Sequence, residues 1–216
     1  MRKAENASRE RLLEAAGEVF AERGYRAATV REITARAGMN VAAVNYHFQN
    51  KEELYAAVLK HAHRSAMESP WVDDPSAPPE ERLGAFVSGM LRHLLDPTRP
   101  AWHRRLMAAE MSAPTPLLSA LIEEGFHPRA LQLREILLEL TGDRLDAETL
   151  DRLGASIIGQ CVFYRQNRPV IQALYPGLLS ERDYLETLAR HITEFSLAGI
   201  RYLRDQTPEG FSHVLL

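Results

Sequence analysis

The side chains best suited to chemistry in this sequence gather in residues 45–51, which read NYHFQNK. Tyr46, His47 and Lys51 offer a hydroxyl group, an imidazole ring and an ammonium group, and each can donate a hydrogen bond to a phosphate oxygen. Asn45 carries a carboxamide, which can form two hydrogen bonds with adenine in the major groove of DNA. The chemistry that this spacing favours is therefore non-covalent binding of a nucleic acid.

Residues 41–48, VAAVNYHF, would form a helix that lacks the charged outer face of an ordinary surface helix. Val44 and Phe48 are four residues apart and can anchor one side of this helix on a core. Ala42 and Ala43 then face outward, where small uncharged side chains suit a close approach to thymine methyl groups. The alternative is that this helix is only a packing unit and that its aromatic residues belong to the core.

Motifs for catalysis are absent from the sequence. It has eight histidines and one cysteine, but no HExxH, no GxSxG and no glycine-rich phosphate loop. His61 and His63 are two residues apart, so their side chains diverge on a helix. Cys161 lies in an apolar segment, where a buried small residue is expected, and a single cysteine makes no Cys-based zinc site. We therefore predict no catalytic residue, no metal site, no cofactor and no enzyme activity.

The composition is that of a globular protein, with 216 residues of which 45% are hydrophobic and 25% charged. The first 20 residues are charged and lack the apolar segment of a signal peptide, and no apolar run is long enough to span a bilayer. A cytoplasmic protein without a membrane partner is expected. The net charge is −3, with +3 in residues 1–64 and −6 in residues 65–216. This asymmetry favours the N-terminal part as the partner of a polyanion.

Helical periodicity runs through almost the whole sequence, and no alternating strand pattern is convincing, so an all-α fold is predicted. The first helix would begin at an N-cap, Ser8, and stop at Gly24. The expected helices cover residues 8–23, 29–38, 40–48, 50–67, 80–95, 101–111, 116–140, 147–167 and 180–206.

Local signals mark a helix-turn-helix within this series. The sequences TVRE and NKEE predict capping boxes that begin at Thr29 and Asn50, and Asn40 can cap the short helix between them. Gly38 stands where the backbone needs a positive φ angle. The proline-rich segment SPWVDDPSAPPEE later interrupts the helices. We place a three-helix DNA-binding domain in residues 1–50 and a larger helical domain in residues 51–216, joined by the helix 51–67.

Two long C-terminal helices are candidates for a dimer interface. A single helix-turn-helix reads only a few base pairs, so a two-fold symmetric dimer doubles the contact with DNA. Small and apolar residues on both helices would allow close packing against a partner. The alternative is that both helices pack only inside the monomer. The predicted interface residues are Ala155, Ile158, Gly159, Val162, Ile192 and Phe195.

The stretches RERLLEAAGEVFAERGY and TVREITARAGMNVAAVNYHFQNKEEL resemble, from about Arg9 to Leu59, the DNA-binding domain of TetR-family transcriptional regulators. The resemblance implies that the residues matching Tyr46, His47 and Lys51, and often Thr29, contact the phosphate backbone. Asn40 and Asn45 depart from the family pattern, which bears on base preference. The predicted DNA-binding set is Thr29, Asn40, Val41, Ala42, Ala43, Asn45, Tyr46, His47 and Lys51.

The stretches AEMSAPTP and IIGQCVFYRQNRPVI look like the CecR-like branch of that family. This resemblance implies a homodimer whose C-terminal domain both dimerises and senses a small molecule. The expected function is a repressor that binds a palindromic operator and is released by that molecule. A DNA-binding protein without a ligand is the alternative. Large, deformable or flat side chains that suit an apolar pocket, and equally an ordinary core, are Met90, His93, Trp102, Met107, Phe126 and Phe163.

Overall fold

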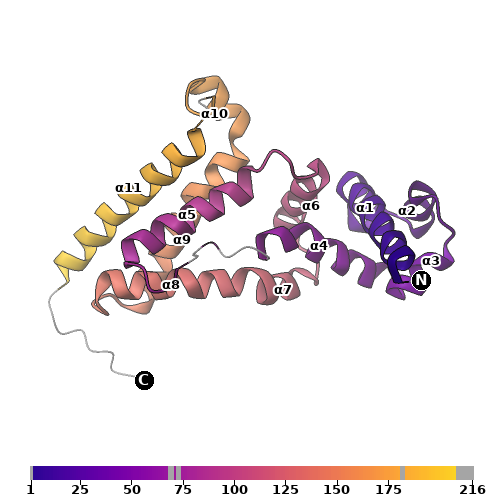
Figure 1. The fold of residues 1–216 in the computed structure, drawn as a ribbon, viewed down its shortest axis with the longest axis horizontal. Helices are drawn as coiled ribbons and strands as arrows, with labels where there is room; N and C mark the ends of the chain where they lie inside the picture. The colour runs from indigo at the N-terminus through magenta and orange to yellow at the C-terminus, as the bar shows by residue number, and fades with distance from the viewer. Residues whose placement is uncertain (1, 68–70, 72–73, 181–182, 208–216) are drawn as a thin grey trace. The chain divides into compact units, whose positions relative to one another are not determined.

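A computed structural model describes residues 2–67, 71, 74–180 and 183–207, and every regular element in those ranges is helical (Figure 1). The predicted all-α fold is thereby confirmed. None of the helices described combines the length and the apolar character needed to cross a membrane. The helices are α1 (Arg2–Ala27), α2 (Val30–Ala37), α3 (Ala42–Phe48), α4 (Lys51–Met67), α5 (Pro79–Leu95), α6 (Ala101–Ser112), α7 (Leu118–Leu121), the π-helix η1 (Ile122–Phe126), α8 (His127–Thr141), α9 (Ala147–Gln166), α10 (Arg168–Leu174) and α11 (Tyr184–Gln206).

The chain forms two compact units, each built from two segments of the sequence. The first unit comprises residues 1–68 and 98–126, and so contains α1–α4, α6, α7 and η1. The second unit comprises residues 69–97 and 127–216, and contains α5 and α8–α11. The functional division into residues 1–50 and 51–216 remains a prediction.

The core of the first unit joins α1–α4 to α6. Its buried members include Leu12, Phe20, Ile33, Val44, Phe48, Leu54, Val58, Trp102 and Leu106. Trp102 and Leu106 belong to α6, although the chain passes through α5 before it reaches them. The helices α2 and α3 therefore rest on a core that α6 helps to complete.

The second unit is a bundle in which α5 packs against α8, α9 and α11 (Figure 1). Its core includes Phe86, Leu91, Leu133, Leu137, Ile157, Cys161 and Ile192. Cys161 is fully buried, and burial raises the pKa of its thiol to about 12. The thiol therefore stays protonated at neutral pH, which agrees with the predicted role as a small core residue.

The predicted start of the first helix is wrong. The helix begins at Arg2, and the Ser8 hydroxyl donates a hydrogen bond of 2.8 Å to the Glu5 carbonyl inside α1, so Ser8 is not an N-cap. The predicted stop coincides with a kink, because Gly24 has φ 75° and ψ 164° within α1.

The single helix predicted over residues 116–140 is also wrong, because α7, the π-helix η1 and α8 take its place. Gly125 in η1 lies against His63 of α4, so that a Cβ atom there would be 2.6 Å from the imidazole ring. Local periodicity does not reveal a contact between segments so far apart. The helix α10 was likewise not predicted, and it begins anew at Arg168 with proline in its first turn.

One buried polar contact ties α4 to α6 within the first unit. Tyr55 donates a hydrogen bond of 2.6 Å to the Glu110 carboxylate, which is only 1% exposed. The other Glu110 oxygen accepts hydrogen bonds from the backbone N–H and the hydroxyl of Thr115, at 2.8 and 2.7 Å. Burial, and then the hydrogen bond to Glu110, raise the pKa of Tyr55. Both oxygens of the buried Glu110 carboxylate therefore accept hydrogen bonds.

Replacing Tyr55 by phenylalanine removes one donor and leaves the buried carboxylate short of a partner. We expect Tyr55→Phe to lower the free energy of unfolding by about 1–3 kcal/mol, as measured by urea denaturation followed by circular dichroism. Tyr175→Phe is the matched control, because Tyr175 is 61% exposed. Equal stabilities of the two variants would contradict the role given to this contact.

Candidate DNA-binding surface

The helix α2 has well-defined ends. The Thr29 side chain accepts a hydrogen bond of 3.1 Å from the Glu32 backbone N–H, which confirms the predicted cap. The Glu32 carboxylate does not complete the capping box and instead pairs with Arg23 at 3.3 Å. At the other end Gly38 adopts the left-handed conformation, with φ 66°, and its N–H bonds back into the last turn of α2. This turn redirects the chain into α3, as predicted.

The short helix α3 is fixed to the first unit by two side chains. Val44 and Phe48 are buried in the core, as their four-residue spacing predicts. Its remaining residues are exposed or half-buried, and Tyr46 is 72% exposed. The predicted cap at Asn40 is wrong, because Val41 occupies the N-cap position and no side chain accepts a hydrogen bond there. The face opposite the core is therefore open and uncharged.

The connection from α3 to α4 is equally tight. Gln49 has a positive φ of 61°, which turns the chain sharply. Asn50 then accepts a hydrogen bond of 2.8 Å from the Glu53 backbone N–H, so its predicted capping role is confirmed. Lys51 is the first residue of α4 and lies beside the end of α3. Free N–H groups and the helix dipole at such an N-terminus attract an anion.

Two of the predicted phosphate donors are held by α1. The Tyr46 hydroxyl donates a hydrogen bond of 3.0 Å to the Glu5 carboxylate, and this bond raises the pKa of Tyr46. The His47 Nε2 atom lies 2.9 Å from the Ser8 hydroxyl oxygen, within hydrogen-bond distance. Neither donor was predicted to have a partner in the protein. In this structure the hydroxyl of Tyr46 and the imidazole of His47 therefore have partners from α1.

The third predicted donor, Lys51, is held by the end of α1. Its ammonium group donates a hydrogen bond of 3.4 Å to the Arg26 carbonyl and lies 4.7 Å from the centre of the Tyr25 ring. Partial burial lowers the pKa of Lys51. The side chain is therefore held close to the surface rather than extended into solvent.

Three residues of α1 beside α3 were missed by the sequence analysis: Glu5, Ser8 and Arg9. Glu5 and Ser8 hold Tyr46 and His47, and the Arg9 guanidinium lies 4.9 Å from the centre of the Phe48 ring. Their spacing of three and four residues is a signal for one shared helix face. The apolar periodicity of α1 predicts its buried face and does not reveal this polar face.

Salt bridges hold α2 against α1 on the outside of the first unit. Both terminal nitrogens of Arg36 donate to the Glu22 carboxylate, at 2.9 and 2.8 Å, and Arg36 also lies 3.6 Å from Glu18. The hydrogen bond from Arg36 lowers the pKa of Glu22. A paired guanidinium–carboxylate contact fixes orientation as well as distance. It limits rotation of α2 about its axis and so helps to set the direction of α3.

The predicted dimer residues lie on α9 and α11 of the second unit. Ala155, Gly159 and Phe195 are exposed, and Ile158 and Val162 are half-buried. Ile192, by contrast, is fully buried in the core of its own unit, so it offers no surface to a partner.

The predicted ligand residues do not form one cluster within either unit. Met90 is buried on α5, His93 is half-buried there, and Phe163 is 50% exposed on α9. Trp102, Met107 and Phe126 belong to the first unit. Trp102 is part of that unit's core and donates a hydrogen bond of 2.9 Å to Glu14.

The capped α2, the glycine turn and the anchored α3 with its open face define a helix-turn-helix protein of the DNA-binding class. Residues 12–58 match the family described as bacterial regulatory proteins, tetR family, and residues 79–200 match the C-terminal domain of the HTH-type transcriptional dual regulator CecR. The chain therefore belongs to the tetR family of transcriptional regulators, with a C-terminal domain of the CecR type. Both matching families are regulators and not enzymes.

Regulators that are similar to this chain match it over a short part of its length. The transcriptional activator FasR of Mycolicibacterium smegmatis is 52% identical over 52 residues, which is 24% of this chain and 24% of that protein. The repressor KstR2 of Mycobacterium tuberculosis is 46% identical over 55 residues, 26% of this chain and 28% of that protein. The matches thus span about a quarter of each relative.

Solved structures share the fold over most of the chain. A tetR-family regulator from Rhodococcus RHA1 has a TM-score of 0.65 and 22% identity, covering 89% of this chain and 96% of that one. AibR in complex with isovaleryl coenzyme A and operator DNA has a TM-score of 0.63 and 19% identity, covering 87% and 97%.

The left-handed conformation of Gly38 makes it the most sensitive backbone position of the turn. We expect Gly38→Ala to lower the free energy of unfolding by about 1–2 kcal/mol, because a Cβ atom disfavours this conformation. Gly177→Ala is the control, since Gly177 also has open space around it and has no left-handed φ angle. Urea denaturation of both variants is the measurement, and a Gly38→Ala curve that overlays the control would disprove the strain.

Proposed function

We propose that this regulator is a repressor that binds a palindromic operator as a homodimer and leaves it when a small molecule binds. The observation that carries the proposal is the open, uncharged face of α3, flanked by Tyr46, His47 and Lys51. Such a face suits the major groove, and the flanking donors suit the phosphates on either side. Since bacterial DNA lies in the cytoplasm, the proposal places the protein there.

Contacts with the DNA bases are proposed for the outward side of α3. Asn45 is exposed and can form two hydrogen bonds with an adenine, and Ala42 can touch a thymine methyl group. Thr29, Asn40 and Val41, which are also exposed, lie at the start of α2 and just before α3, where they can reach the backbone or a base edge. Binding at this surface requires Tyr46 to exchange its contact with Glu5 for one with a phosphate.

Homodimerisation is proposed through exposed faces of α9 and α11. Gly159 and Gly199 both face open space, and exposed aromatic rings flank them at Phe163, Phe195 and Tyr202. Gln160 of α9 donates a hydrogen bond of 3.3 Å to Ser196 of α11, so the two helices adjoin here. Phe195 and Tyr202 are 65% and 66% exposed, and large apolar side chains at that exposure favour burial by a partner. Ile192, which is fully buried, packs α11 onto the core of its own unit.

Release by a small molecule is proposed for the second unit. AibR, a neighbour in fold, was solved with isovaleryl coenzyme A and operator DNA. Met90 and His93 on α5 are the predicted ligand residues of this unit with an interior position. Reciprocal linkage requires that operator DNA weaken ligand binding by the factor by which ligand weakens DNA binding. Calorimetry of an acyl-coenzyme A with and without operator tests this, and equal affinities would reject release by that compound.

The proposed function is tested by selecting bound sequences from random double-stranded DNA with the full chain. We expect a palindrome whose two half-sites lie about one helical turn apart, together with a dimer in sedimentation equilibrium. Selection of an asymmetric site, or binding by a monomer, would reject the homodimer.

A reporter gene placed downstream of the selected site tests whether the protein represses or activates transcription. An increase in transcription would reject repression. FasR is a transcriptional activator and KstR2 is a transcriptional repressor, so similar proteins include both kinds of regulator.

The phosphate contact of Lys51 has a specific signature in salt dependence. We expect Lys51→Ala to weaken specific and random DNA alike and to reduce the slope of log affinity against log salt by about one. Lys60→Ala is the matched control, because Lys60 lies further along α4 and pairs with Glu124 at 2.7 Å. Fluorescence anisotropy over a salt series measures both slopes. An unchanged slope for Lys51→Ala would remove this residue from the interface.

The contact between Tyr46 and Glu5 predicts a variant that binds DNA more tightly. Glu5→Gln removes a negative charge beside the proposed phosphate position, so we expect affinity to rise about fivefold at low salt. The gain should shrink as salt screens the charge. Glu80→Gln changes the net charge equally but lies in the second unit. A gain of the same size in this control would show that net charge, not the position of Glu5, is responsible.

A further inference from the structure

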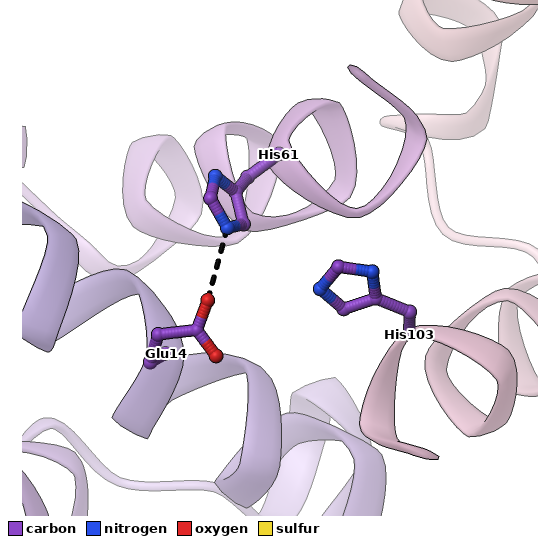
Figure 2. Close-up of side chains that lie close together, drawn as sticks. All are labelled: Glu14, His61 and His103. Carbon is purple, nitrogen blue, oxygen red and sulfur yellow. Dashed lines mark hydrogen bonds and ion pairs between the residues drawn. The ribbon is translucent and has the colours of Figure 1, made fainter. Parts of the chain in front are cut away.

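Three side chains from three helices of the first unit meet at one point (Figure 2). Glu14 comes from α1, His61 from α4 and His103 from α6. Each offers one atom able to bind a metal ion, and these atoms all lie within 4.8 Å of one another. We propose that they form a binding site for a divalent transition-metal ion, with zinc as the best-suited ion.

The strongest observation is the state of His103. Its side chain is only 9% exposed, yet neither ring nitrogen has a hydrogen-bond partner among the described residues. Burying an imidazole without a partner is costly, so such a group calls for an explanation. In Figure 2 one ring nitrogen of His103 points toward the space beside Glu14 and His61. A metal ion in that space would give this nitrogen its missing partner.

The other two ligands are already close together. Glu14 Oε1 and His61 Nε2 lie 3.0 Å apart. In a tetrahedral zinc site with bonds of about 2.0–2.1 Å, neighbouring ligand atoms are about 3.3 Å apart. The widest of the three separations is at most 4.8 Å and therefore has to shrink by up to about 1.5 Å, which a small rotation of one imidazole ring can provide. The fourth position would be left to water.

The surroundings of Glu14 fit a metal ligand. Its second carboxylate oxygen, Oε2, accepts a hydrogen bond of 2.9 Å from the indole N–H of Trp102. Outer contacts of this kind orient a metal-binding carboxylate. The His61 ring also stacks on Trp102, with ring centres 6.2 Å apart and planes inclined by 10°. Trp102 thus fixes two of the three proposed ligands.

Charge and protonation set the class of ion. Two imidazole nitrogens with one carboxylate oxygen suit zinc and similar transition ions better than calcium or magnesium, which prefer oxygen ligands. A metal ion binds an imidazole through an unprotonated ring nitrogen, and both ring nitrogens of His103 are buried without a hydrogen-bond partner among the described residues. Arg99 and Arg104 also oppose a cation, although the Arg99 guanidinium donates to the Ala62 carbonyl and that of Arg104 to the Arg99 carbonyl. The positive charges of Arg99 and Arg104 therefore limit the affinity of the site for a metal ion.

The test is calorimetric titration of the full, tag-free and chelator-treated chain with zinc ions. We expect the wild type to bind a single ion, and His103→Gln and Glu14→Gln each to bind it about 100-fold more weakly or worse, since each loses a ligand. The carboxamide introduced by Glu14→Gln would keep an acceptor for Trp102, so this variant supplies the result if His103→Gln does not fold. His127→Gln, which removes an exposed imidazole of the second unit, should bind as the wild type does.

A second measurement identifies the ligand atoms. Cobalt ions in the site should give visible d–d absorption without the near-ultraviolet band of a thiolate, because the one cysteine is buried in the second unit. Absence of zinc binding by the wild type, equal binding by all three variants, or a thiolate band would each overturn the proposal. None of these outcomes depends on DNA binding, so the site and the proposed operator can fail independently.

Discussion

The surface proposed to bind DNA depends on the burial of two side chains, Val44 and Phe48. A helix of seven residues is too short to be stable in water by itself, because nucleation costs more than so few hydrogen bonds return. These two residues bring it onto the core formed by α1, α2, α4 and α6. The turns at Gly38 and Gln49 then determine where it begins and ends. Outward residues of α3 such as Ala42 and Asn45 can remain short and uncharged because the two buried anchors hold the helix.

The polar residues Tyr46, His47 and Lys51, on α3 and at the start of α4, are not held by burial in the core. In the free protein Tyr46, His47 and Lys51 each have a partner from α1. The proposed contacts with phosphates would therefore exchange one set of hydrogen bonds for another, and their net gain would be smaller than a count of contacts suggests. In return the side chains lose less conformational freedom when they bind, because they are already confined.

Sequence reasoning succeeded where the cause was local and failed where it was tertiary. The caps at Thr29 and Asn50, the turn at Gly38 and the two anchors of α3 follow from neighbours within four residues. The π-helix η1 holds Gly125 against His63, which is about sixty residues away, and the partners of Tyr46 and His47 come from about forty residues away. The prediction of no metal site rests on spacing along one helix, and such spacing does not reveal side chains that meet from three helices. His61 and His63 do diverge, but His61 meets Glu14 and His103 through packing.

The first unit is not continuous in the sequence, and this affects how such proteins recombine. Trp102 and Leu106 complete its core, yet they lie within residues 79–200, the part shared with CecR-type C-terminal domains. An exchange of DNA-binding domains between relatives at the boundary of the 12–58 match would separate α1 and α4 from the α6 that evolved against them. Positions such as Gly17, where an added Cβ atom would collide with the Trp102 ring, must therefore change in step with α6. The two matched parts of the sequence are thus coupled through packing, so that a DNA-binding domain taken from a relative has to fit the α6 that it meets.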